Sequence, residues 1–105
     1  MKQVILVQRA QNAVHKFTAV LPNGTRVHFG RKGYSDYTIH KDQERMKRYL
    51  VRHRKRENWG SRGVNTAGFW SRWLLWSKPS LQAAARETER ALGFKYKIKF
   101  STRNK

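Results

Sequence analysis

Short apolar runs and turn residues alternate over the first third of the chain. Residues 4–7 are apolar and mostly β-branched within the segment 3–8, which is typical of a buried strand. The segments 14–21 and 26–30 also alternate, and they flank Pro22-Asn23-Gly24-Thr25. Asn-Gly favours a tight hairpin, because both residues tolerate positive φ angles. The pattern therefore predicts three strands before the first helix.

Two later segments repeat their apolar residues with the period of a helix. The first covers about 39–54, with Thr38 as its expected cap. The second starts at Ser77 or Ser80 and reaches about Leu92, with Gly93 where a C-terminal glycine cap belongs. Both segments predict amphipathic helices. The apolar face of the first holds Ile39, Met46, Tyr49, Leu50 and His53.

The most apolar stretch covers residues 66–81 and contains three of the four tryptophans, spaced three residues apart. On a helix, Trp73 and Trp76 share one face with Phe69, and Trp70 points in another direction. A helix that is apolar nearly all round is buried nearly all round. We therefore expect this helix, ended by Pro79, to be the centre of the core. The alternative is that one of its faces is left for a second subunit.

Residues 94–100 alternate strictly between apolar side chains and lysines, which predicts a half-buried strand. We expect residues 101–105 to form a short mobile tail. Strands grouped before helices favour an α+β fold. The prediction is one domain over residues 1–105, with a small antiparallel sheet of about four strands in βββ-ααα-β order. The helices pack on one face, and the last strand lies beside the first.

Positive charge is the strongest feature of the composition, with 24 Lys plus Arg against 6 Asp plus Glu and a net charge of +18. Such self-repulsion favours a polyanionic partner, and nucleic acid is the natural candidate. The absence of cysteine excludes disulfides and thiolate zinc sites. The apolar run at residues 4–7 is too short for a signal sequence or a membrane span. We therefore expect a soluble protein that is not secreted by the usual route and has no membrane partner.

A cationic stripe with helical spacing lies opposite the apolar face of the 39–54 helix and consists of Lys41, Arg45, Arg48 and Arg52. Arginine offers forked hydrogen bonds to phosphate oxygens, so the stripe indicates phosphate contact. The basic run 52–56 and the lysine face of the last strand extend this interpretation. A plainly solvated helix face, and edge lysines that deter aggregation, are the alternatives. The candidate nucleic-acid-binding residues are Lys41, Arg45, Arg48, Arg52, Arg54, Lys55, Arg56, Lys95, Lys97 and Lys99.

Catalytic patterns are missing from the sequence. Asp42 and His53 share a helix face but lie three turns apart, too far to bind one ion, and His40 points elsewhere. There is no phosphate-binding glycine-rich loop and no hydrolase elbow. We therefore predict a protein that is not an enzyme, with no catalytic residue, metal, cofactor or small-molecule substrate.

Several motifs together resemble a family of short basic proteins of large nucleocytoplasmic DNA viruses, including the marseilleviruses. The likeness covers about residues 29–81. It implies a small viral protein carried in the virion, present in the host cytoplasm or nucleus during infection, and it brings no catalytic residues. The motifs are Phe29-Gly30-x-x-Gly33-Tyr34-Ser35-Asp36-Tyr37-Thr38-x-His40-Lys41-Asp42, Tyr49, Arg52-His53, Glu57-x-Trp59, Gly68-Phe69-Trp70-Ser71-Arg72-Trp73-Leu74-Leu75-Trp76 and Lys78-Pro79-Ser80-Leu81.

The function predicted from these features is mainly sequence-independent binding of duplex DNA, on viral or host nuclear DNA. One alternative is an adaptor whose tryptophan-rich helix binds a viral or host protein. Another is RNA binding, which would require exposed stacking aromatics. A homodimer is also predicted, because the tryptophan helix presents apolar side chains in nearly every direction.

Overall fold

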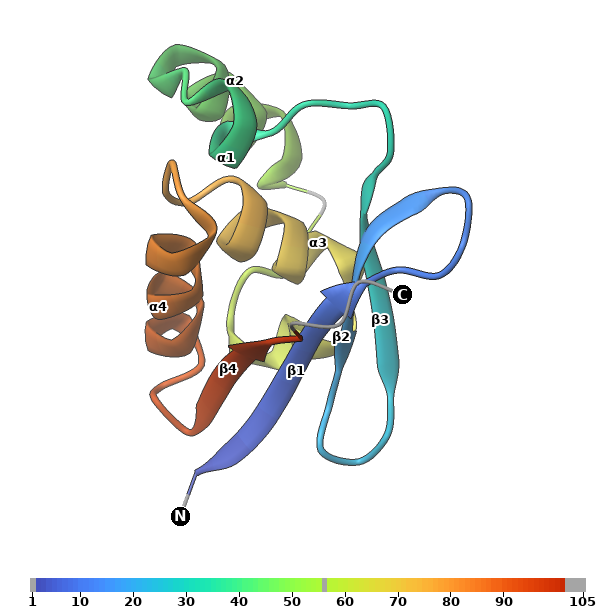
Figure 1. Cartoon of the computed structure of the whole chain (residues 1–105). Coiled ribbons are helices and arrows are strands. Elements are labelled where there is room, and N and C mark those ends of the chain that lie inside the picture. Colours follow the sequence, from blue (N-terminus) through green and yellow to red (C-terminus); the bar gives the residue numbers. More distant parts are fainter. Residues whose placement is uncertain (1, 56, 102–105) are drawn as a thin grey trace.

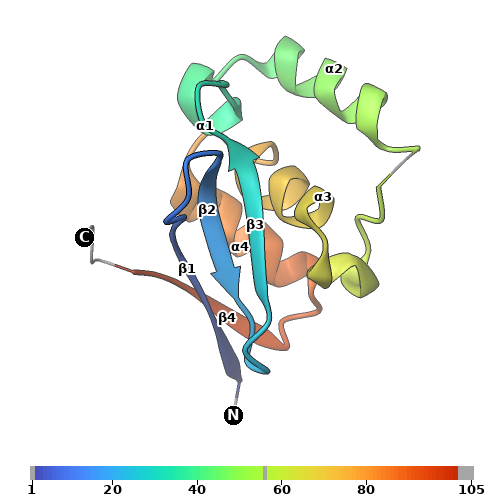
Figure 2. The same ribbon diagram turned by 90° about the vertical axis from the view of Figure 1, so that its right-hand side faces the viewer.

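Three strands, a run of helices and a final strand follow one another in the computed structural model, which describes residues 2–55 and 57–101 (Figure 1). Helices α3 and α4 lie over one side of the sheet (Figure 2). The predicted α+β class, four strands and element order are confirmed. The elements are β1 (Gln3–Arg9), β2 (His15–Val20), β3 (Arg26–Arg31), α1 (Tyr37–His40), α2 (Gln43–His53), the 3₁₀-helix η1 (Ser61–Asn65), α3 (Ala67–Trp70), the π-helical turn η2 (Ser71–Leu75), α4 (Leu81–Ala91) and β4 (Tyr96–Phe100).

The sheet has the strand order β3-β2-β1-β4. The predicted hairpin joins β2 to β3, with Gly24 at a φ of +90°. β4 pairs with β1 as predicted, but the pair is parallel, with Ile98 opposite Ile5. The sheet is therefore mixed, and the prediction of a wholly antiparallel sheet is wrong. The helices supply the crossover connection that a parallel pair requires, so β4 starts at the same end of the sheet as β1.

The core lies between the sheet and the tryptophan-rich segment. Trp70 is fully buried, its ring lies 5.8 Å from that of Phe29, and its Nε1 donates to the Val64 carbonyl at 2.8 Å. Trp73 and Trp76 are only partly buried. The prediction that this segment is the centre of the core is therefore confirmed, although Trp73 and Trp76 lie at its rim. The other buried apolar residues include Ile5, Val7, Ala19, Phe69, Leu74, Leu75, Ala84, Ala85 and Ile98.

The predicted 39–54 helix is interrupted, because two aspartates each cap a helix. Asp36, rather than Thr38, caps α1 by accepting from the Thr38 N–H at 2.9 Å. Lys41 ends α1 with a φ of +55°, and Asp42 then caps α2. The predicted continuous helix is therefore wrong between residues 40 and 43, and Lys41 lies outside α2.

The tryptophan helix is built from α3 and the wider turn η2, and Thr66 caps it by accepting from the Phe69 N–H. Of the two candidate caps for the next helix, Ser80 caps α4 by accepting from the Ala83 N–H at 3.2 Å. The predicted tail lies outside the described residues apart from Ser101, whose N–H donates to the Val7 carbonyl at 2.8 Å. Within 2–55 and 57–101, no helix is long and apolar enough to cross a membrane.

Candidate nucleic-acid interface

Helix α2 lies away from the sheet (Figure 2). It contacts the tryptophan segment through the stacked rings of Tyr49 and Trp76. The Tyr49 and Trp76 rings are parallel within 1°, with centroids 4.2 Å apart. The His53 ring also stacks on Tyr49, with centroids 4.2 Å apart. Burial raises the pKa of the Tyr49 phenol above its ordinary value, so this ring stays neutral. The stack fixes the inner face of α2 and turns its other side toward solvent.

Glu57 holds the segment that follows α2. Its Oε2 lies 3.1 Å from Nδ1 of His53, and its Oε1 accepts from Nε1 of Trp59 at 2.9 Å. Gly68 lets this side chain approach, because a Cβ there would lie 2.8 Å from Cδ of Glu57. The carboxylate is therefore used to anchor α2, and it is partly covered rather than presented beside the cations.

The outer side of α2 carries arginines at the predicted spacing. Arg45, Arg48 and Arg52 are all exposed, and so are Arg54 and Lys55 just after them. No ion pair joins any of these five cations to a carboxylate among the described residues. The salt bridge that α2 does contain, between Glu44 and Lys47, is 4.0 Å long and exposed, so it neutralises little. We call these five residues the α2 cation group.

Most of the acidic residues have partners within the fold. Asp36 and Glu89 are buried, and Glu89 accepts from the Ile98 N–H at 2.9 Å. Asp42 caps α2, and Glu87 lies 3.9 Å from Arg90. Most of the cations are therefore left at the surface without a counter-charge, which creates a positive potential around the molecule.

Arg72 is a cation committed to packing. Its guanidinium carbon lies 4.1 Å from the ring centre of Trp73 and 5.3 Å from that of Trp59. Burial lowers the pKa of Arg72 from its ordinary value. We therefore leave Arg72 out of the candidate interface and assign it to cation–π packing under α2.

The remaining predicted site residues lie in different parts of the structure. Lys41 lies between α1 and α2, and its Nζ donates to the carbonyl of Thr38 at 3.1 Å and to that of Pro79. Lys95, Lys97 and Lys99 are exposed on and before β4, far from α2 (Figure 1). Arg56 lies outside the described residues. The candidate site is thus the α2 cation group, with the β4 lysines as a separate surface.

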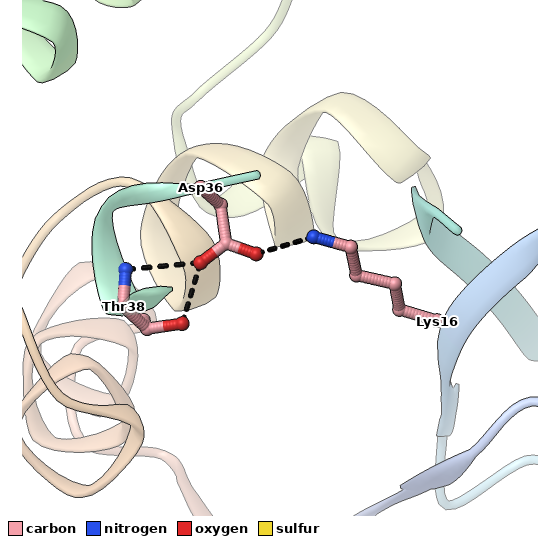
Figure 3. A network of polar contacts seen from close by, with 3 residues as sticks. All are labelled: Lys16, Asp36 and Thr38. Atoms are coloured by element: carbon pink, nitrogen blue, oxygen red, sulfur yellow. Dashed lines mark hydrogen bonds and ion pairs between the residues drawn. The ribbon is translucent and has the colours of Figure 1, made fainter. Parts of the chain in front are cut away.

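Sequence reasoning missed a cleft of about 830 Å³ at one end of the sheet. Its lining includes Arg9 from β1, Lys32 after β3 and Lys41. These residues are far apart in the sequence, so no local pattern connects them. One wall contains Lys16 and Asp36, whose Nζ and Oδ2 are 2.6 Å apart (Figure 3).

The two candidate metal ligands on the predicted helix have other roles. Asp42 caps α2, and His53 contacts Glu57. Burial lowers the pKa of His40, whose Nδ1 accepts from the Asp42 N–H at 2.8 Å. In the described part of the chain, no three His, Cys, Asp or Glu side chains come together as a metal site.

Residues 5–53 match the model of a family described as "Family of unknown function (DUF5754)". The matched segment extends from β1 to the end of α2 and leaves out the tryptophan segment, α4 and β4. The description assigns no function to that family. No curated protein and no solved structure matches the chain.

Proposed function

We propose that this protein binds duplex DNA through its phosphates, without catalysis, and that α2 is the main contact. The observation that carries the proposal is the α2 cation group: Arg45, Arg48 and Arg52 on the anchored helix, and Arg54 and Lys55 just after it, are exposed and lack ion pairs within the described residues. The resemblance to viral proteins extends the proposal to a virion protein that acts on viral or host nuclear DNA.

The chemistry of α2 fits phosphates better than base edges. An 11-residue helix is about 16 Å long, which is enough to follow several phosphates of a duplex. Arginine side chains form forked hydrogen bonds to phosphate oxygens, and such contacts position a protein without reading sequence. The exposed side of α2 is dominated by cations, so we expect little discrimination between DNA sequences.

The adaptor function has less support than DNA binding, because the tryptophans are used within the chain. Trp70 is buried, Nε1 of Trp73 donates to the Trp59 carbonyl at 2.8 Å, and Trp76 lies under Tyr49. RNA binding through exposed stacking rings is likewise disfavoured, since most aromatic rings contribute to packing.

The test compares two triple variants with the same change in net charge. Arg45→Glu/Arg48→Glu/Arg52→Glu reverses the α2 cations, whereas Lys2→Glu/Arg26→Glu/Arg62→Glu reverses exposed cations elsewhere. Binding of a blunt duplex is titrated by fluorescence anisotropy at several salt concentrations. Losing three phosphate contacts is expected to reduce the log–log salt slope by about 3, and the control is expected to change it by less than about 1.

Circular dichroism and thermal melting check that both variants remain folded, which we expect because the reversed side chains are exposed. If the folded α2 variant binds DNA as well as the control variant, then α2 is only a solvated helix face. If neither variant differs from the unmodified protein, the proposal of phosphate binding itself fails.

A further inference from the structure

The cleft at the end of the sheet has the size and lining of a ligand site. It opens between the end of the sheet, α1 and the start of α4, and its volume of about 830 Å³ lies in the usual range for small-molecule pockets. We propose that this cleft holds one unpaired nucleotide of the nucleic acid bound by α2. The inference rests on the proposed function and adds to it the form of nucleic acid that is preferred.

The apolar part of the lining offers surfaces for a base. Phe17 of β2 and Phe100 of β4 contribute partly buried rings, and Leu81 of α4 lies with them. Bases stack on aromatic side chains with little dependence on sequence, since every base has a π face. An inorganic phosphate would leave these surfaces unused, so the lining favours a ligand with a flat apolar part.

The charged part of the lining suits a phosphate. Nζ of Lys32 donates to the Asn12 carbonyl at 2.8 Å, and Nζ of Lys41 donates to the Pro79 carbonyl. These hydrogen bonds hold both ammonium groups in place without neutralising them. Arg9 is exposed and has no ion pair in the described residues. Leu81 and Gln82, the first two residues of α4, line this cleft. The N–H groups in the first turn of a helix have no acceptor within the helix, and the positive end of the helix dipole favours an anion there.

The carboxylate in this lining, Asp36, does not oppose an anion. It is 2% exposed, its Oδ2 lies 2.6 Å from Nζ of Lys16, and its Oδ1 accepts from the N–H and hydroxyl of Thr38 (Figure 3). The negative charge of Asp36 is thus compensated by Lys16. Arg9, Lys32 and Lys41 therefore give the cleft a net positive charge.

The position of Lys41 connects the cleft to α2. Ile39 and Lys41 line the cleft, and α2 begins two residues after Lys41. The cleft therefore lies next to the N-terminal end of α2, where a strand that leaves a duplex bound there would enter it. This continuity favours a nucleotide of the bound strand over a free small molecule.

The experiment compares a blunt duplex with the same duplex carrying a three-nucleotide overhang, using 3′ and 5′ overhangs in separate titrations by anisotropy. We expect at least one overhang to lower Kd about fivefold or more, from the strength of one base stacked on an aromatic ring. Equal affinity for the blunt and both overhang duplexes would overturn the inference and leave the proposed function standing. No binding to any duplex would instead overturn the proposed function.

Variants test whether the preference for an overhang duplex depends on the cleft. Arg9→Glu/Lys32→Glu is expected to abolish the overhang preference, whereas the matched control Arg26→Glu/Arg62→Glu retains it. Phe100→Leu removes one ring at constant charge, so it is expected to reduce the preference and leave blunt-duplex affinity unchanged. The α2 triple variant is expected to bind both ligands more weakly with the same ratio between them.

Melting curves confirm that each variant is folded. A preference that survives in folded Arg9→Glu/Lys32→Glu, or that is unaffected by Phe100→Leu, would show that the unpaired nucleotide binds elsewhere.

Discussion

The Lys16–Asp36 pair allows a quantitative test of how this protein is held together. Replacing Asp36 with alanine removes the cap of α1 and leaves the Lys16 ammonium, whose side chain is only 15% exposed, without its counter-charge. Losing a helix cap costs about 1 kcal/mol, and breaking a buried pair by removing one partner costs about 3–5 kcal/mol. Because a lysine can partly extend to water, we expect about 3–4 kcal/mol for both effects together.

Companion variants separate the two contributions. Asp36→Asn keeps an oxygen that can cap α1 but removes the charge, so it is expected to cost about 1 kcal/mol less than Asp36→Ala. Lys16→Met/Asp36→Ala removes both charges and is expected to recover about 2 kcal/mol relative to Asp36→Ala alone. The free energies of unfolding come from urea titrations followed by tryptophan fluorescence and far-UV circular dichroism. A loss below about 1 kcal/mol for Asp36→Ala, or no recovery in the double variant, would refute this account of the pair.

The remaining predictions concern salt, the tryptophans and association. The unmodified protein is expected to bind duplex DNA with a log–log salt slope near −5 if about six phosphates are contacted, and a flat salt response in anisotropy titrations would contradict phosphate binding. Trp70→Ala is expected to destabilise the fold by about 3–5 kcal/mol in urea unfolding, and Trp73→Ala by less because it is only partly buried; the reverse order would contradict the described core. The homodimer stays a prediction, and salt is expected to strengthen it while weakening DNA binding; light scattering that gives a monomer mass at low and moderate salt would rule it out.

The elements with local signals could be predicted from the sequence. A β-branched apolar run located β1, alternation located the other strands, and Asn23-Gly24 located the hairpin. Gly93 located the end of α4, whereas its start was left open between Ser77 and Ser80. The direction of β4 could not be predicted, because it depends on how the helices pack rather than on the strand itself. Asp36 and Asp42 are a local signal for two helices interrupted at Lys41, because aspartate is a favoured N-cap residue. Thr38 is also a favoured N-cap residue, and a cap at Thr38 is compatible with one long helix, which is why the sequence did not reveal the interruption.

The candidate site could be predicted only in part. The arginines of α2 follow from helical spacing, whereas the anchoring of α2 does not. That anchoring requires Gly68 to make room for Glu57, a contact between two segments with no common pattern. The cleft is even harder to predict from the sequence, because Arg9, Lys32 and Lys41 come together only after the sheet has formed and α1 has packed against its end.

The parallel pairing of β4 with β1 has a consequence for folding order. Nearly the whole described chain separates the two partners, so this edge of the sheet closes only after the intervening helices have assembled. Until then, β1 is paired on one side only, with β2, and its other side presents free backbone groups to other chains. A nascent or truncated chain that lacks β4 is therefore expected to aggregate through β1. Polyanions that neutralise the +18 charge early in folding would remove the repulsion that opposes this aggregation.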